Sequence, residues 1–313
     1  MDVLTEVEIA SLLDPEVAVG IPGTLAHHLP DSELTVDLVR SVDRRLAVMP
    51  EPSGSSEWLN RSDGSRLELR HYGPATADAT MSRSVILWIH GGGMFLGSAR
   101  QDDAACQELS ETLGVRIASV DYRLAPEHPY PEPLRDCYLA LGWLAERFDR
   151  VVVVGSSAGG GLAAGLALLA RDRSGPAIAG VQLHYPMLDD RETAGARRLA
   201  NTSVWNARLN RLGWAAYLGG NEPDAYAAPA RAVDLAGLPP LYLDTGEFDL
   251  FHDEDAAFAE RVRAAGGAID FYVESAAVHA FDLVAPDAAV SRAAVARRRE
   301  WLATVLRGNG GAS

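Results

Sequence analysis

Two adjacent serines follow a run of four valines in the segment VVVVGSSAGGGLAAG, residues 151–165. Residues 155–159 match the pattern G-x-S-x-G, in which the central serine lies on a sharp strand-to-helix turn with its hydroxyl exposed above a sheet. Ser156 would be the central serine only if residue 154 were glycine, and it is valine. The pattern therefore predicts Ser157 as a nucleophile.

The same glycines also permit a phosphate-binding interpretation, since Gly159, Gly161 and Ala164 match the loose spacing G-x-G-x-x-A of dinucleotide sites. Such a site also needs an acidic residue at the end of the next strand, and the expected strand 181–185 ends without one. All 28 basic residues are arginine, so mechanisms that need a lysine, such as a Walker loop or a Schiff base, are excluded. The nucleophile interpretation is favoured.

A serine becomes nucleophilic at neutral pH only beside a base, which an acid must orient. Asp249 follows an expected strand at 241–245, and His279 follows the next one at 269–273. After a serine on a strand-to-helix turn of this kind, the acid is expected first along the chain and the base second. We therefore predict Asp249 as the acid and His279 as the base. Competing residues lie nearby: His252 as a base, and Asp253 and Glu247 as acids.

The segment His90-Gly91-Gly92-Gly93 directly follows the expected strand 85–89. Glycines allow the main chain itself to approach a substrate. The N–H of a glycine here and that of Ala158, the residue after the nucleophile, can converge on a carbonyl oxygen. This segment predicts an oxyanion hole.

Beyond residue 60 the apolar pattern alternates between strand and helix. Strands are expected at 67–72, 85–90, 115–120, 151–155, 181–185, 241–245 and 269–273, and helices at 101–113, 133–147, 158–171, 253–265 and 287–306. Several strands are continuous apolar runs, which is typical of a parallel sheet buried on both faces. The predicted class is α/β with a mostly parallel sheet.

Two regions depart from this alternation. Residues 1–50 have helical apolar spacing, and residues 188–226 form a long insertion between two expected strands. We predict that both form a helical cap, and that 51–187 together with 227–313 form the catalytic domain.

Charge and composition narrow the function further. A net charge of −15 argues against binding to nucleic acid or to an anionic membrane. Residues 297–299 are all arginine, but their helical context favours a solvated helix face. Cys106 and Cys137 fit a reducing compartment, and the sequence has no signal peptide or membrane-span pattern, so a cytoplasmic location is expected.

The motifs together resemble the hormone-sensitive-lipase-like family of α/β-hydrolases, also called bacterial family IV esterases, and more weakly its branch of heroin and acetyl-ester esterases. The resemblance covers about residues 60–305 and rests on HGGGMF (90–95), DYRLAPEHPYPEPLRD (121–136), GSSAGGGLAA (155–164), GEFDLFHDE (246–254) and VHAF (278–281).

Membership would imply an α/β-hydrolase fold with a helical cap, a triad of Ser157, His279 and Asp249, and no cofactor or metal. It would also imply that Gly91, Gly92 and Ala158 supply oxyanion-hole N–H groups, while His90 and Gly93 shape the loop. The chain departs from the family at Ser156, where the usual motif G-D-S-A-G carries an aspartate. We expect this change to affect a hydrogen bond or substrate preference rather than catalysis.

The predicted activity is a serine carboxylesterase that acts on small to medium esters, with short acyl chains favoured. An amidase or acyltransferase with the same triad and a non-catalytic ligand-binding homologue are the alternatives. Met94, Trp205 and Trp214 are candidates for pocket walls, although core packing explains each equally well. A homodimer is compatible with the sequence, because the strand at 269–273 could lie at a sheet edge.

Overall fold

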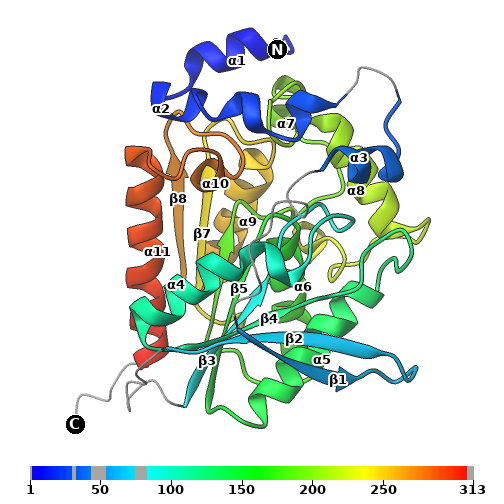
Figure 1. The fold of residues 1–313 in the computed structure, drawn as a ribbon, viewed down its shortest axis with the longest axis vertical. Helices are drawn as coiled ribbons and strands as arrows, with labels where there is room; N and C mark the ends of the chain where they lie inside the picture. The colour runs from blue at the N-terminus through cyan, green and yellow to red at the C-terminus, as the bar shows by residue number, and fades with distance from the viewer. Residues whose placement is uncertain (1, 30–32, 44–53, 75–82, 309–313) are drawn as a thin grey trace.

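The computed structural model describes residues 2–29, 33–43, 54–74 and 83–308, and its centre is an eight-stranded sheet (Figure 1). The strands, in chain order, are β1 (Ser55–Asn60), β2 (Arg66–Tyr72), β3 (Ser84–Ile89), β4 (Arg116–Val120), β5 (Arg150–Ser156), β6 (Gly180–His184), β7 (Leu241–Gly246) and β8 (Ile269–Glu274). The spatial order is β1-β2-β4-β3-β5-β6-β7-β8. Pairing is parallel from β4 to β8, and β2 is antiparallel to both of its neighbours.

The central strands are buried because their side chains are apolar on both faces. In β5, Val152 and Val154 pack in one cluster while Val151 and Val153 pack in another. The continuous apolar runs predict these strands correctly. The polar strand β1, exposed except at Leu59, has no such signal and was not predicted.

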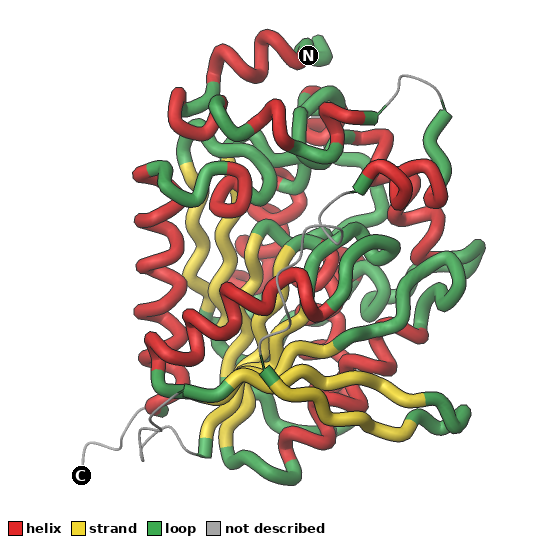
Figure 2. Tube along the Cα trace, in the orientation of Figure 1, coloured by secondary structure: helices red, strands yellow, loops and turns green. Residues whose placement is uncertain are grey.

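Helices cover both faces of the sheet (Figure 2). On one face lie α4 (Asp103–Leu113) and α11 (Ala289–Arg307), whose apolar residues pack with Val152 and Val154. The other face is covered by α5 (Glu132–Ala145), α6 (Ala158–Asp172) and α9 (His252–Ala264). Three-residue and four-residue 3-10 helices lie at Ile21–Gly23, Ala26–His28, Ala99–Asp102 and Pro229–Arg231.

Two helical segments far apart in the sequence lie together over the carboxyl ends of the strands (Figure 1). The first holds α1 (Glu6–Leu12), α2 (Pro15–Ala18) and α3 (Val36–Val42), and the second holds α7 (Ala194–Arg198) and α8 (Ala207–Leu218). Leu4 N–H donates to Arg198 O at 2.9 Å, and the Thr24 hydroxyl donates to Ser203 O at 2.5 Å. Residues 44–50 of the predicted cap lie outside the described residues.

None of the helices within the described ranges has the length and apolar character needed to cross a membrane. The strand β8 lies at one edge of the sheet, as the sequence suggested.

The arginine cluster is not the solvated face that the sequence predicts. Arg298 is only 4% exposed, and its guanidinium binds both carboxylate oxygens of Asp244 at 2.7 and 2.8 Å. It also binds Asp282, on the short helix α10 (Phe281–Val284). Arg298 falls on the buried stripe of α11, four residues from both Ala294 and Leu302, so its charge is matched inside the protein.

We expect Arg298→Met to lower the free energy of unfolding by about 3 kcal/mol, because the buried carboxylate of Asp244 and the largely buried one of Asp282 lose their cation. Arg299→Met is the matched control: its partner Glu108 is 64% exposed in the side chain, so the loss should stay below about 1 kcal/mol. Urea denaturation of both variants tests the difference, and equal losses would contradict it.

Candidate active site

The turn between β5 and α6 places Ser157 in a strained backbone conformation. Its φ of 54° and ψ of −117° are unusual for any residue other than glycine. A Cβ on Gly155 would lie 2.1 Å from Gly159 O, and a Cβ on Gly159 would lie 2.1 Å from Ile89 O. The flanking glycines are therefore required by the close approach of α6 to β5 and β3.

The structure brings Ser157, His279 and Asp249 into one hydrogen-bonded line. His279 Nε2 lies 2.9 Å from the Ser157 hydroxyl, and His279 Nδ1 lies 2.8 Å from Asp249 Oδ2. The other carboxylate oxygen of Asp249 accepts the N–H of Phe251 at 2.9 Å, which fixes this fully buried side chain. The imidazole has one nitrogen on the acid and the other on the serine, as proton transfer requires.

The competing acid and base residues face elsewhere. His252 opens α9 and contacts its neighbour Asp253, 3.2 Å away. The carboxylate of Asp253 accepts the N–H of Gly195 at 2.7 Å, and that of Glu247 accepts the N–H of Ala276 at 2.9 Å.

The glycine loop after β3 runs beside Ser157. A Cβ on Gly91 would lie 3.4 Å from the Cβ of Ser157. Gly92 has a φ of +126°, which favours glycine. Within the described ranges, no hydrogen bond is donated by the main-chain N–H of Gly92 or of Ala158, the first residue of α6. These N–H groups are available to a substrate oxygen.

His90 is fully buried under this loop rather than exposed to a substrate. Its Nδ1 lies 2.8 Å from Gly91 O, and its ring stacks on Tyr122 with centroids 4.1 Å apart. The Tyr122 hydroxyl donates to His90 O at 2.9 Å. The contacts of His90 are thus with Gly91 of the glycine loop and with Tyr122.

A cavity of about 1160 Å³ opens around the serine and histidine. Ser157, His279 and Gly91–Gly93 line it, together with residues of the two helical segments such as Thr24 and Trp205. Ligand sites typically measure about 300–1,000 Å³, so this cavity has room for a substrate well above the smallest esters.

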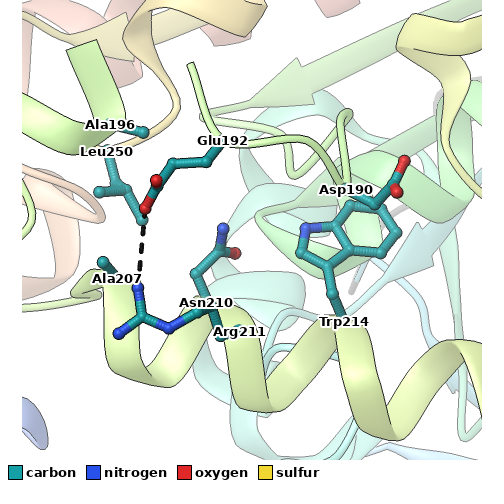
Figure 3. A pocket seen from close by; sticks show the side chains of 8 residues that line it. All are labelled: Asp190, Glu192, Ala196, Ala207, Asn210, Arg211, Trp214 and Leu250. Atoms are coloured by element: carbon teal, nitrogen blue, oxygen red, sulfur yellow. Dashed lines mark ion pairs between the residues drawn. The ribbon is translucent and has the colours of Figure 1, made fainter. Parts of the chain in front are cut away.

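The three predicted pocket residues have different positions. Trp205 lines the large cavity, and a Cβ on Gly93 would lie 2.1 Å from its ring. Trp214 lines a separate cavity of about 150 Å³, where Figure 3 shows it beside Asp190 and opposite the Glu192–Arg211 ion pair. Met94 is fully buried and packs toward Gly161.

Comparison with known proteins places this geometry in a family. Residues 86–283 match a family model described as alpha/beta hydrolase fold. The chain belongs to the α/β-hydrolase family. The carboxylesterase NlhH of Mycobacterium tuberculosis is 32% identical over 275 residues, which cover 81% of this chain and 85% of NlhH.

Two further relatives identify the branch of this α/β-hydrolase. The hormone-sensitive lipase of Mus musculus is 30% identical over 237 residues, 72% of this chain and 30% of the lipase. The structure titled bacterial heroin esterase has a TM-score of 0.83 and 35% identity, and covers 95% of this chain and 99% of its own. The predicted fold, the hormone-sensitive-lipase-like family and the esterase class are confirmed.

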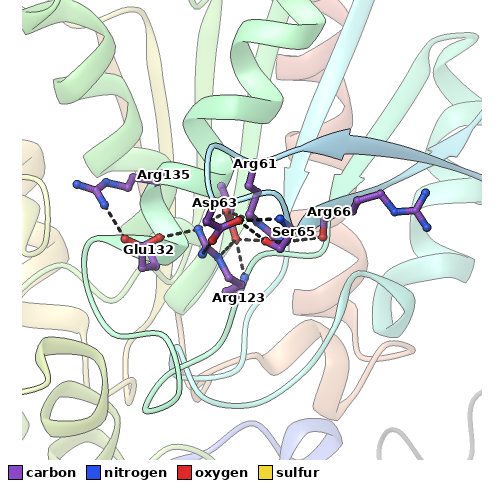
Figure 4. A network of polar contacts seen from close by, with 8 residues as sticks. Arg61, Asp63, Ser65, Arg66, Arg123, Glu132 and Arg135 are labelled. Carbon is purple, nitrogen blue, oxygen red and sulfur yellow. Dashed lines mark hydrogen bonds and ion pairs between the residues drawn. The ribbon is translucent and has the colours of Figure 1, made fainter.

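The motif at residues 121–136 of this hydrolase takes part in a cluster of ion pairs. The carboxylate of Asp136 is 1% exposed, and it accepts hydrogen bonds from Arg61 Nε at 2.7 Å and from Arg123 Nε at 3.0 Å. Figure 4 shows Arg61 and Arg123 beside Asp63 and Glu132. The same motif supplies Tyr122, the residue before Arg123, which stacks on His90.

Sequence reasoning missed the residues that hold the histidine loop. The Tyr185 ring meets His279 edge-on with centroids 4.9 Å apart, and its hydroxyl donates to Asp282 Oδ1 at 2.8 Å. Asp282 is in turn bound by Arg298. Three separated segments converge here, and only the arginine run gave a local signal in the sequence.

We expect Gly159→Ala to reduce both stability and activity, because its methyl group would collide with the main chain of β3. The loss of unfolding free energy should be about 2 kcal/mol or more. Gly142→Ala, in α5, is the matched control: no heavy atom lies within 4 Å of the added Cβ, so helix propensity should stabilise by up to about 1 kcal/mol. Thermal denaturation of both variants measures this, and a stable, active Gly159→Ala enzyme would contradict it.

Proposed function

We propose that this esterase hydrolyses small to medium carboxylic esters, with short acyl chains favoured, through an acyl-enzyme on Ser157. The observation that carries the proposal is the continuous line from Asp249 through His279 to Ser157, with hydrogen-bond distances of 2.8 and 2.9 Å. This line gives the serine both a base and an oriented proton path.

In the first half of the reaction the Ser157 oxygen attacks the acyl carbon while His279 Nε2 takes its proton. The carbonyl oxygen becomes an oxyanion, stabilised by the N–H groups of Gly91, Gly92 and Ala158. The negative Asp249 stabilises the imidazolium without itself becoming protonated. When the tetrahedral intermediate collapses, the bond to the alcohol oxygen breaks and His279 donates its proton to that oxygen.

In the second half, water replaces the alcohol. His279 removes a proton from the water, whose oxygen attacks the acyl carbon on Ser157. The second tetrahedral intermediate then expels the serine oxygen, which takes the proton back from His279. The carboxylic acid leaves and the enzyme returns to its starting state.

The same proposal extends to the surroundings of the site. Residues 1–50 and 188–226 act as a cap, supported by the contacts between their helices and by the share of the cavity wall they form. The free, buried Cys106 and Cys137 fit a cytoplasmic protein, and the edge position of β8 leaves a strand available for a homodimer.

Hydrolysis of p-nitrophenyl acetate by single variants tests the triad. We expect Ser157→Ala and His279→Gln to lower kcat by about 10⁴-fold or more, and Asp249→Asn by about 10⁴-fold with little change in KM. Replacing the acyl chain by longer homologues should lower kcat/KM, and the matched anilide should react far more slowly.

His252→Gln is the matched control, since this histidine also follows β7 but does not reach the serine. Its activity should stay within about twofold of the wild type, because the residue holds no reacting group. Retention of activity by His279→Gln together with its loss in His252→Gln would overturn the assignment of the base.

A further inference from the structure

Ser156, the neighbour of the nucleophile, belongs to a second hydrogen-bonded chain. Its hydroxyl lies 3.3 Å from Nδ1 of His184, its partner in the β5–β6 register, and His184 Nε2 lies 2.9 Å from Gln182 Oε1. Gln182 Nε2 donates to the main-chain oxygen of Arg298 at 2.9 Å. This chain crosses the face of the sheet that α4 and α11 cover.

The last acceptor, the main-chain oxygen of Arg298, determines which group donates in each of these hydrogen bonds. A main-chain oxygen can only accept, so Gln182 presents its amide oxygen to His184, and His184 carries its proton on Nε2. Burial, reinforced by the charge of Arg298, holds the pKa of His184 well below its ordinary value, so the ring is neutral. Ser156 therefore donates to Nδ1, and its oxygen remains an acceptor facing the cavity.

The large cavity does not end at the triad. It continues between α4 and α11 over the strands, and we call this part the side channel. Its walls combine residues of three strands and both helices: Trp88, Ala105, Leu109, Ser156, His184 and Leu302. Four of these six side chains are apolar, and Ser156 lies where the channel meets Ser157.

The charged side chains on the walls of the side channel are bound by neighbouring groups of the protein. Arg298 binds Asp244 and Asp282, and Arg299 binds Glu108 across the two helices at 2.6 Å. The Trp88 indole donates to Asp102 at 2.7 Å. Paired walls of this kind favour an uncharged ligand over a carboxylate or phosphate.

We propose that the side channel binds the alcohol arm of the ester, and that it selects an uncharged, mainly apolar arm carrying a hydroxyl that donates to Ser156. The inference rests on the proposed function and names the substrate class for the same site. It also gives Ser156 a role, because its hydroxyl is a neutral acceptor. An aspartate at this position would place a negative charge beside His184 and favour the protonated form of that histidine.

The alcohol arm is favoured over the acyl arm because of where the channel joins the site. Tyr185 directly follows His184 of the channel wall and lines the same cavity, and its ring meets that of His279 edge-on with centroids 4.9 Å apart. His279 Nε2 must deliver its proton to the alcohol oxygen, so that oxygen lies on the histidine side of the acyl carbon. We therefore place the alcohol arm, which extends from that oxygen, in the side channel.

The first test fills the channel. Ala105 is exposed on α4 and lines the channel, so Ala105→Trp should narrow it without disturbing the core. The ratio of kcat/KM for hexyl acetate to that for ethyl acetate should fall by on the order of tenfold. This is the loss expected if about two methylene groups of the hexyl chain are no longer buried. Ala104→Trp is the matched control. Ala104 is the exposed neighbour of Ala105 and is not among the residues that line the cavity, so this variant should keep the wild-type ratio.

The second test removes the acceptor. Monoacetates of diols of increasing length are compared with their methyl ethers, which cannot donate. The wild type should prefer one hydroxyl-bearing acetate over its ether by roughly three- to tenfold in kcat/KM, and Ser156→Ala should bring that preference close to one.

The outcomes separate this inference from the proposed function. Suppose that the wild type hydrolyses ethyl acetate. The assignment of the side channel to the alcohol arm is then wrong if Ala105→Trp leaves the ratio of kcat/KM for hexyl acetate to that for ethyl acetate unchanged. It is also wrong if Ala105→Trp instead lowers kcat/KM for ethyl hexanoate relative to ethyl acetate. The same holds if the hydroxyl preference is absent or survives in Ser156→Ala. If the wild type hydrolyses none of these esters and the triad variants change nothing, the proposed function itself fails.

Discussion

The structure depends above all on the tight contact between the main chain of α6 and the ends of β5 and β3. Gly155 and Gly159 permit that contact, since a Cβ on either would come within 2.1 Å of a main-chain oxygen. The contact forces Ser157 into its positive φ, which lifts the hydroxyl out of the sheet, and brings the N–H of Ala158 toward the glycine loop. Strain at this residue is held by two strands and a long helix, all buried.

Charge pairs buried at a distance from the serine keep the other loops in place. Asp136 binds Arg61 and Arg123, and Arg123 follows Tyr122, which stacks on His90; Arg298 binds Asp244 and Asp282, and Asp282 lies three residues after His279. Because these charges are paired, directional contacts add to apolar packing in this part of the structure.

Much of this could be predicted from the sequence, because the signals were local. Continuous valine and isoleucine runs marked β3 and β5, and the glycine patterns marked the turn at Ser157 and the loop at Gly91–Gly93. The rest depends on neighbours that are distant in the chain. The burial of Arg298 follows from Asp244, 54 residues away, and the partner of Ser156 is His184 on the next strand. Trp205 and Trp214 look alike in the sequence, yet they line different cavities.

Covalent labelling tests the central claim most directly, because two adjacent serines must be told apart. The protein is treated with a fluorophosphonate, which traps a serine that has an activating base, and is then cleaved after arginine. Cleavage at Arg150 and Arg171 releases one peptide with both serines, and fragmentation locates the adduct. We expect one phosphonyl group, on Ser157. An adduct on Ser156, or full hydrolytic activity with Ser157 unlabelled under saturating reagent, would contradict the account.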